Sequence, residues 1–296
     1  MKRLKKESEM RVAVLGTGIM GAPIAANIAS AGHDVIVWNR TREKAEQVEG
    51  AEVATDPADA ARGADVVVTM LSSAEVVREV MTGGALEAMD GDAIWLQTST
   101  VGVDETDDLA GLAREAGVAI VDSPVLGTKK PAEDAKLTVV AAGPQATRER
   151  AGAVFDAIGQ KTVWLGEEPG AATRAKLVIN TWVLGMTEAL AEALALARGL
   201  GVDQATVLEI LDGNPAGSPY AQIKGKLILS GSFEPSFPLR LAAKDAKLVL
   251  DAAPDGLRLP ATKATAGHMA RVAEAGHGDE DMAATYLACV DGGDAA

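Results

Sequence analysis

The chain has 296 residues, of which 48% are hydrophobic and 24% charged, so it can fold into two ordinary globular domains. Its net charge of −14 and its 3% of aromatic residues disfavour nucleic acid as a partner, because phosphates would be repelled and bases would find few stacking surfaces. The single cysteine fits a reducing cytoplasm, and the three histidines have no Cys or His partners at metal-ligand spacing, so we predict a cytoplasmic protein without a metal site.

A basic cluster of Lys2, Arg3, Lys5 and Lys6 precedes the first predicted strand, and we interpret it as a solvated tail. The strand that follows, residues 11–15, ends at a glycine, so no apolar segment there is long enough for a secretory signal. No uninterrupted apolar run elsewhere reaches the roughly 18 residues that a membrane span needs. We therefore predict neither secretion nor a membrane partner.

Short β-branched segments alternate with helical segments over the first 165 residues. The predicted strands are residues 11–15, 34–38, 65–70, 93–96, 118–121, 137–142 and 161–165. Nearly continuous apolar strands separated by helices are typical of a mostly parallel sheet that is covered on both faces. The pattern predicts an α/β, doubly wound domain over residues 1–167.

Gly16, Gly18 and Gly21 form the spacing G-x-G-x-x-G between the first predicted strand and a predicted helix. In that context the glycines let the backbone turn tightly and approach a pyrophosphate, whose charge the helix N-terminus then meets. The alternative is a glycine turn with a purely structural role. We predict that this loop, with Ile19 and Met20 inside it, binds a dinucleotide.

The second predicted strand ends in Trp38-Asn39-Arg40-Thr41, where an NAD-binding protein usually carries an acidic residue for the ribose diol. Arg40 can instead pair with a 2′-phosphate, and Thr41 can add a donor, so the sequence favours NADP(H) as the cofactor, bound by Asn39, Arg40 and Thr41. The alternative is that Arg40 is only a surface residue at a strand end.

The alternation stops near Gly170, and the segment from 171 to 198 is rich in Ala and Leu and contains no proline. It predicts one long helix, bounded by Pro169 and Gly170 before it and by Gly199 after it. Further predicted helices cover residues 203–212, 241–252 and 260–274. No convincing strand lies between them, so we predict an all-α second domain over residues 168–296, joined to the first by the long helix.

Lys176 and Asn180 lie one turn apart in a stretch of this helix that is otherwise almost entirely apolar. An amine in such surroundings either reaches to water or lines a cleft. Because the predicted helix starts directly after the segment that links the two domains, we expect the lysine to line the interdomain cleft and face the nicotinamide.

The chain resembles the β-hydroxyacid dehydrogenase family (3-hydroxyisobutyrate dehydrogenase-like) over roughly residues 10 to 290, and it is most similar to the glyoxylate/succinic semialdehyde reductase branch. The matching motifs are VAVLGTGIMGAPIAANI, VWNRT, MLS at 70–72, STV at 99–101, DSPVLGTKKPAEDAKLTVVAAG at 122–143, KLVIN at 176–180 and FPLRLAAKD at 237–245.

This resemblance implies a Rossmann-like domain followed by an all-α domain, and an NADP-dependent oxidoreductase that reduces a small aldehyde acid. Lys176 would supply the proton to the carbonyl oxygen, Asn180 would position the lysine and the substrate, and Asp245 would fix the lysine amine. Other residues are expected to bind the ligands. Thr100 and the backbone of Leu126, Gly127 and Thr128 would hold the substrate carboxylate, Phe237 and Lys244 would close the site, and Met70, Leu71 and Ser72 would line the cofactor cleft, which Thr100 and Lys244 would also contact.

One departure from the family pattern affects the substrate. Where the family commonly reads D-x-P-V-S-G, this chain has Leu126 in place of the serine. Losing one charge-assisted donor would weaken carboxylate binding by about 1.5–3 kcal/mol. Ser123 points to the other side of the strand by alternation and is a poor substitute. The resemblance therefore leaves the substrate open.

The sequence leaves two other functions as alternatives. An imine reductase shares the two-domain plan, but such enzymes usually replace the lysine with Asp or Tyr, so Lys176 argues against this function. A non-catalytic NADP-binding protein is the third possibility, and members of that kind lose the lysine. The apolar helix faces of the second domain predict self-association, as a homodimer or homotetramer.

Overall fold

The computed structural model describes residues 9–290, so the basic cluster at Lys2, Arg3, Lys5 and Lys6 lies outside the described residues. The chain divides into two compact units, Met1–Lys176 and Leu177–Ala296. The division falls inside the long helix α9 (Ala171–Gly199). A domain boundary between residues 167 and 168, at the start of this helix, stays a prediction.

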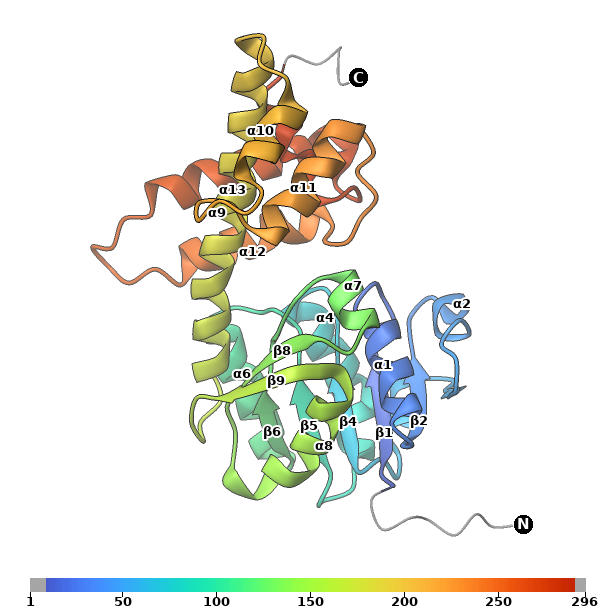
Figure 1. The fold of residues 1–296 in the computed structure, drawn as a ribbon. Coiled ribbons are helices and arrows are strands. Elements are labelled where there is room, and N and C mark those ends of the chain that lie inside the picture. The colour runs from blue at the N-terminus through green and yellow to red at the C-terminus, as the bar shows by residue number, and fades with distance from the viewer. Residues whose placement is uncertain (1–8, 291–296) are drawn as a thin grey trace. The chain divides into compact units, whose positions relative to one another are not determined.

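A six-stranded parallel sheet forms the centre of the first unit, with strand order β3-β2-β1-β4-β5-β6. Its strands are β1 (Arg11–Leu15), β2 (Asp34–Trp38), β3 (Ala51–Val53), β4 (Val66–Thr69), β5 (Ile94–Gln97) and β6 (Ala119–Asp122). This is the doubly wound order, in which the strands are added toward β3 first and then, from β4 on, toward the opposite edge, so that the strand order reverses between β1 and β4. The carboxyl ends of those strands are where such sheets bind ligands, and Figure 1 shows them side by side.

Both faces of this sheet are buried, because alternate residues of each strand point to opposite sides. Val12 and Val14 pack in one apolar cluster with α1 (Gly21–Ser30) and α8 (Arg148–Ile158). Ala13 and Leu15 pack in a second cluster on the other face. That cluster includes residues from α3 (Pro57–Ala61), α4 (Ala74–Val80), α5 (Leu86–Ala88), the π-helical turn η1 (Met81–Ala85) and α6 (Val103–Glu115). The predicted doubly wound fold is confirmed.

A separate three-stranded sheet follows β6, in the order β7-β8-β9. It consists of β7 (Val125–Leu126), β8 (Leu137–Ala141) and β9 (Gly159–Trp164), and β7 pairs antiparallel with β8. The sequence predicted β8 and β9 as strands of one mostly parallel sheet, and that part was wrong. The short helices α2 (Arg42–Ala45), α7 (Lys129–Glu133) and the 3₁₀ turn η2 (Gln145–Thr147) complete the unit.

The second unit is helical. It contains most of α9, then α10 (Gln204–Leu211), α11 (Pro219–Ser230), α12 (Leu239–Asp251), α13 (Pro260–Val272), the π-helical turn η3 (Ala273–His277) and the 3₁₀ helix η4 (Met282–Ala288). The described residues of this unit hold a single isolated β-bridge, between Pro238 and Asp281. The prediction of an all-α second part is therefore confirmed, although the sequence reasoning missed α11.

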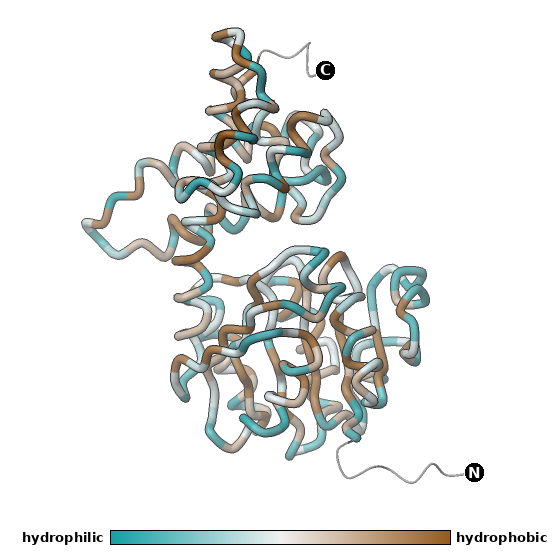
Figure 2. The backbone as a smooth tube through the Cα atoms, viewed as in Figure 1, coloured by the Kyte–Doolittle hydropathy of each residue, from teal (hydrophilic) through white to brown (hydrophobic). Residues whose placement is uncertain are grey.

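The later part of α9 packs within the second unit, with Leu184 in one apolar cluster and Leu190 and Leu194 in another. It is long and apolar enough to cross a membrane by length and composition, with 44% of its most apolar window buried. A core helix of a folded domain meets the same criteria. Figure 2 shows how hydrophobic and hydrophilic residues alternate along the backbone of this helix. Its Val178 and Trp182 side chains are each 71% exposed.

Candidate functional site

The three glycines of the loop after β1 have three different physical roles. Gly16 has a φ of +103°, and a Cβ there would lie 2.3 Å from the Met70 carbonyl oxygen. A Cβ on Gly21 would lie 1.9 Å from the carbonyl oxygen of Gly16. Gly18, by contrast, is exposed, and no described protein atom lies within 4 Å of its Cβ position. The outer two glycines allow the tight turn and the packing of α1, whereas Gly18 leaves an open surface on the loop.

The residues of this loop fit the pyrophosphate of a dinucleotide. The Thr17 hydroxyl is buried and has no hydrogen-bond partner among the described residues. Helix α1 follows directly, and its N-cap residue, Met20, makes no side-chain capping hydrogen bond. An anion that accepts hydrogen bonds from this loop and helix would satisfy those donors. Ile19 and Met20 are half-buried within the loop.

Asn39 connects the glycine loop to the end of β2. Its Oδ1 accepts a hydrogen bond from the Thr17 N–H at 3.1 Å, and its Nδ2 donates to the Thr41 carbonyl at 2.9 Å. The Gly16 N–H also donates to the Trp38 carbonyl at 2.8 Å. Arg40 and Thr41, both exposed, therefore follow a strand end that is fixed next to the loop. The structure brings these predicted cofactor residues together at one edge of the sheet.

The ends of β4 and β5 reach the same edge. The Met70 N–H donates to the Leu15 carbonyl at 3.0 Å, and the Leu71 N–H donates to Ser99 Oγ at 2.9 Å. Ser72 is exposed and Thr100 is half-buried, directly after Ser99. Sequence reasoning did not single out Ser99, which is buried and holds the segment after β4 in place.

The segment after β6 carries the predicted carboxylate-binding residues. Gly127 has a φ of +130°, and half-buried Thr128 is the N-cap of α7. The Leu126 side chain packs against a small apolar cluster formed by Val140, Ala142 and Ala172. The alkyl group at position 126 therefore contributes to packing in the first unit.

Ser123 is fully buried, and its hydroxyl donates to the carbonyl oxygens of Val121 at 3.3 Å and Gln97 at 3.4 Å. The inference that Ser123 does not replace the missing serine is thus supported.

Lys176 lies in the second turn of α9 and is half-buried. Its Nζ donates a hydrogen bond to the Val125 carbonyl at 2.9 Å. Val125 directly precedes the segment 126–128. The amine is therefore held at a fixed place in the first unit, next to the backbone predicted to bind the substrate carboxylate.

Asn180, Lys244 and Asp245 meet within the second unit. Asn180 Nδ2 donates to Asp245 Oδ2 at 2.9 Å, and Lys244 Nζ lies 3.0 Å from Asp245 Oδ1. Both Asn180 and Asp245 are 3% exposed. Asp245 thereby orients the Asn180 amide, and its predicted contact with Lys176 stays a prediction. Half-buried Phe237 lies at the start of the segment that leads into α12.

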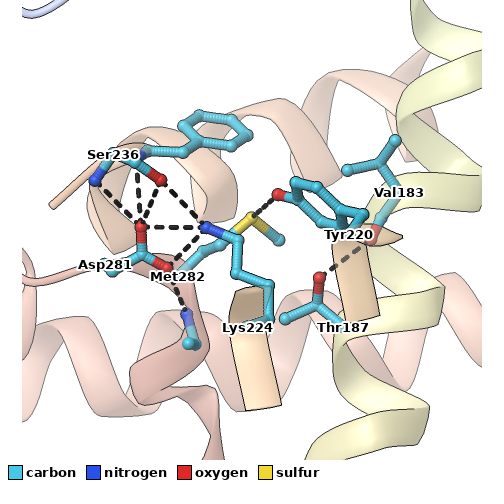
Figure 3. Close-up of polar contacts among 9 residues, drawn as sticks. Val183, Thr187, Tyr220, Lys224, Ser236, Asp281 and Met282 are labelled. Atoms are coloured by element: carbon cyan, nitrogen blue, oxygen red, sulfur yellow. Dashed lines mark hydrogen bonds and ion pairs between the residues drawn. The ribbon is translucent and has the colours of Figure 1, made fainter. Parts of the chain in front are cut away.

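A buried ion pair that sequence reasoning missed lies in the second unit, between Lys224 on α11 and Asp281 before η4 (Figure 3). The Lys224 Nζ lies 2.7 Å and 2.9 Å from the two carboxylate oxygens, and the two side chains are 1% and 0% exposed. The Ser236 hydroxyl and the N–H groups of Ser236, Phe237 and Ala283 also donate to Asp281. Because each oxygen of this carboxylate is satisfied by protein donors, we assign the pair to the fold of the second unit.

Burial on its own would raise the pKa of Asp281, but the Lys224 charge and these hydrogen bonds together hold that pKa below its ordinary value. Tyr220 packs its ring 5.1 Å from the Lys224 amine and donates its hydroxyl to the Met282 sulfur. Burial, with a smaller contribution from the Asp281 charge, raises the pKa of Tyr220 well above its ordinary value. We therefore expect the Tyr220 hydroxyl to stay protonated at neutral pH.

Glu188, Glu192 and His268 bring possible metal-ligand atoms within 4.8 Å of one another. His268 Nδ1 contacts Glu188 Oε1, while Thr285 Oγ1 donates to Glu188 Oε2 at 2.6 Å. Both oxygens of the buried Glu188 carboxylate thus have protein partners, and we assign the cluster to a His–Glu contact. The expectation that the protein has no metal site stays a prediction.

Two family models match successive parts of the chain. Residues 11–166 match the NAD binding domain of 6-phosphogluconate dehydrogenase, and residues 170–289 match the NAD-binding domain of NADP-dependent 3-hydroxyisobutyrate dehydrogenase.

Among curated proteins, an uncharacterized oxidoreductase of Bacillus subtilis, YfjR, is 37% identical over 95% of this chain and all of its own length. Glyoxylate/succinic semialdehyde reductase 1 of Arabidopsis thaliana is 32% identical over 94% of this chain and 98% of its own. The solved structure of Mycobacterium tuberculosis 3-hydroxyisobutyrate dehydrogenase with L-serine has a TM-score of 0.81 and 30% identity, covering 94% of this chain and 98% of its own. With its glycine loop, doubly wound sheet and helical second part, this chain belongs to the β-hydroxyacid dehydrogenase family of NAD(P)-dependent oxidoreductases.

Proposed function

We propose that the protein catalyses the NADPH-dependent reduction of a small aldehyde acid, or a related carbonyl compound, to the hydroxy acid. The observation that carries this proposal is the Lys176 amine, which is held 2.9 Å from the Val125 carbonyl directly before the segment 126–128. A fixed ammonium group next to a carboxylate-binding backbone is suited to donating a proton to the carbonyl of an aldehyde acid. The Arabidopsis relative that matches nearly its whole length is named for such substrates.

In this proposal NADPH, when bound, supplies the hydride. Lys176 donates a hydrogen bond to the carbonyl oxygen and transfers a proton to it as negative charge develops, an interaction that is stronger in the transition state than in the ground state. Asn180 follows Lys176 by one turn of α9 and orients the substrate, and its own amide is fixed by Asp245. Because the Asn180 Nδ2 donates to Asp245, the Asn180 Oδ1 is the atom that would accept a hydrogen bond from the substrate.

The preference for NADPH over NADH rests on Arg40 and Thr41. They follow β2, at the position where an acidic residue would bind the ribose diol of NAD, and both are exposed. The planar guanidinium of Arg40 can form two hydrogen bonds with a 2′-phosphate, and Thr41 offers one more. Arg40 is thus our proposed determinant of cofactor choice.

Leu126 limits which groups can bind the substrate carboxylate. Its side chain packs in an apolar cluster and has no group that can donate to a carboxylate, so the backbone N–H groups of residues 126–128 and the Thr100 hydroxyl carry carboxylate binding in our proposal. Substituting Leu126→Ser should strengthen binding of aldehyde acids by roughly 10- to 150-fold in KM if the added hydroxyl reaches the carboxylate, which corresponds to about 1.5–3 kcal/mol.

A substrate panel tests the proposal. NADPH consumption is measured with glyoxylate, succinic semialdehyde, uncharged short aldehydes and a cyclic imine, with wild-type protein and Leu126→Ser. The proposal predicts turnover of at least one aldehyde acid by the wild type. Turnover of the imine alone would instead identify an imine reductase. Binding of NADPH without turnover of any compound would identify a non-catalytic protein.

We also propose that the protein assembles as a homodimer or homotetramer and acts in the cytoplasm without a nucleic-acid or membrane partner. Val178 and Trp182 each leave 71% of their surface exposed on α9, and burying them against a second copy would be favourable. Burial and the charges of Glu188 and Glu192 raise the pKa of the sole cysteine, Cys289, to about 11, so its thiol is mainly protonated at neutral pH. Light scattering on wild type and Trp182→Glu tests the assembly, since only the wild type is expected to exceed one subunit in mass.

A further inference from the structure

Asp122, the last residue of β6, binds the beginning of α9 from a distant place in the sequence. Its Oδ2 accepts hydrogen bonds from the N–H groups of Gly170 and Thr173, both at 2.8 Å. Its Oδ1 accepts one from the Thr173 hydroxyl, also at 2.8 Å. The first turn of α9 contains no acidic residue of its own, so the Asp122 carboxylate acts as the cap for N–H groups that this helix end leaves free.

The carboxylate is itself held rigidly. Asp122 is 1% exposed, and its backbone exchanges two hydrogen bonds with Ala142, at 2.9 Å and 2.8 Å. Burial raises the pKa of Asp122, and the donors from Gly170, Ala172 and Thr173 oppose that shift. The Thr173 hydroxyl also contacts Thr106 Oγ1 at 3.0 Å, and Thr106 donates to the Gly102 carbonyl at 2.8 Å. Because the Thr173 and Thr106 protons are already donated to Asp122 and Gly102, the two hydroxyls make a polar contact only, and these buried contacts place the first turn of α9 beside the start of α6.

The same short segment also binds the amine. Val125, three residues after Asp122, accepts the hydrogen bond from Lys176 Nζ at 2.9 Å. Thr173 and Lys176 are three residues apart on α9, so their side chains lie on neighbouring positions of one helix face. Residues 122–125 therefore hold α9 at two points, by its first N–H groups and by the Lys176 amine.

We propose that Asp122 is a positioning residue: it fixes the rotation and depth of the first turn of α9, and thereby the location of the Lys176 amine relative to residues 126–128. This inference rests on the proposed role of Lys176 as the proton donor. It assigns no chemical step to Asp122. A shift of about 1 Å in a catalytic group can reduce a rate by about 100-fold. If losing the Asp122 cap displaces the Lys176 amine by that much, kcat should fall measurably.

Two substitutions of Asp122 separate the effect of its hydrogen bonds from the effect of its negative charge. In Asp122→Asn the amide oxygen can accept both N–H groups, and the amide nitrogen can donate to the Thr173 hydroxyl, which then donates to Thr106. In Asp122→Ala the two N–H groups and the hydroxyl lose their acceptor. A positioning role predicts a kcat lowered by about 10- to 100-fold in Asp122→Ala and restoration of most of that loss in Asp122→Asn.

Hydrogen exchange gives a readout that is independent of activity. In Asp122→Ala the amides of Gly170 and Thr173 should exchange at least about tenfold faster than in wild type, because each loses its acceptor. Asp56→Ala is the matched control: it removes the carboxylate cap of α3, whose Asp56 side chain accepts from the Asp59 N–H, and should leave α9 and turnover unaffected. Should Asp122→Ala fail to fold, Thr173→Val removes one donor, keeps both N–H bonds and should lower kcat by about 3- to 10-fold.

A double-mutant cycle with Lys176→Ala decides whether the effect acts through the lysine. If Asp122 positions the amine, Asp122→Ala should change the residual kcat of Lys176→Ala by less than about threefold. If Asp122→Ala lowers the kcat of Lys176→Ala as much as it lowers that of the wild type, the inference is overturned. It is also overturned if the kcat of Asp122→Asn is as low as that of Asp122→Ala, or if Asp122→Asn changes the pH–rate profile. If Lys176→Ala alone turns over like wild type, the proposed function fails instead, and the hydrogen-exchange result still reports whether Asp122 holds the helix.

Discussion

Two substitutions in the glycine loop should separate cofactor binding from folding. In Gly18→Ala the new methyl group meets no described protein atom within 4 Å, so we expect the free energy of unfolding to change by no more than about 0.5 kcal/mol. The methyl group would, however, occupy the surface that a pyrophosphate approaches. Losing one charge-assisted hydrogen bond from the loop costs about 1.5–3 kcal/mol, which corresponds to roughly 10- to 150-fold weaker NADPH binding.

Gly21→Ala should behave differently. Its methyl group would lie 1.9 Å from the Gly16 carbonyl oxygen, a backbone atom, so the loop or α1 must move. Such overpacking costs about 1–3 kcal/mol of folding stability, and cofactor binding falls as well.

The assays are urea unfolding of the free proteins and calorimetric titration with NADPH, with Gly91→Ala as the control at an exposed glycine that also has open space around it. Wild-type NADPH affinity in Gly18→Ala, or destabilisation equal to that of Gly21→Ala, would refute the assignment of the open surface to the cofactor.

The other predictions concern cofactor choice and the buried pair. Arg40→Ala should raise the Kd for NADPH by at least about tenfold and leave that for NADH nearly unchanged, and equal effects on both would remove its assigned role. Lys224→Met should lower the free energy of unfolding by about 3–5 kcal/mol, and adding Asp281→Asn should recover part of it; thermal unfolding that matches wild type would contradict a stabilising pair. Because the pKa of Asp281 is held below its ordinary 3.8, the ionised carboxylate contributes fully to the free energy of unfolding above pH 3.8, and this contribution is lost as the pH falls through the folded-state pKa. Below pH 3.8 the free energy of unfolding should therefore depend less steeply on pH in Asp281→Asn than in the wild type.

Periodicity and local signals predicted the larger elements. The runs RVAVL and DVIVW became β1 and β2 with the predicted limits, and α9 was predicted to within one residue. The strands β3 and β7 have three and two residues, which is too short for a recognisable alternation. Helix α11 was missed although its signals are present, since Ser218 caps it, Pro219 begins it and Gly231 ends it with a left-handed φ.

The candidate site was predicted where a motif is local and missed where partners are distant in the sequence. The glycine loop and Lys176 follow from short patterns. The capping of α9 by Asp122 joins residues 48 to 51 positions apart, and the Lys224–Asp281 pair joins residues 57 apart. Hydrophobic periodicity places such residues on a face of an element but does not specify which distant side chain they meet, so only the folded structure reveals these contacts.

The most direct test of the account is the rate of NADPH oxidation by Lys176→Met with saturating aldehyde acid. We predict a kcat lowered by about 100- to 10,000-fold, the range in which general acids contribute, with unchanged NADPH affinity and with wild-type turnover in the control Lys161→Met, at an exposed lysine on β9. A kcat of Lys176→Met equal to that of wild type would contradict the assignment of Lys176 as the proton donor.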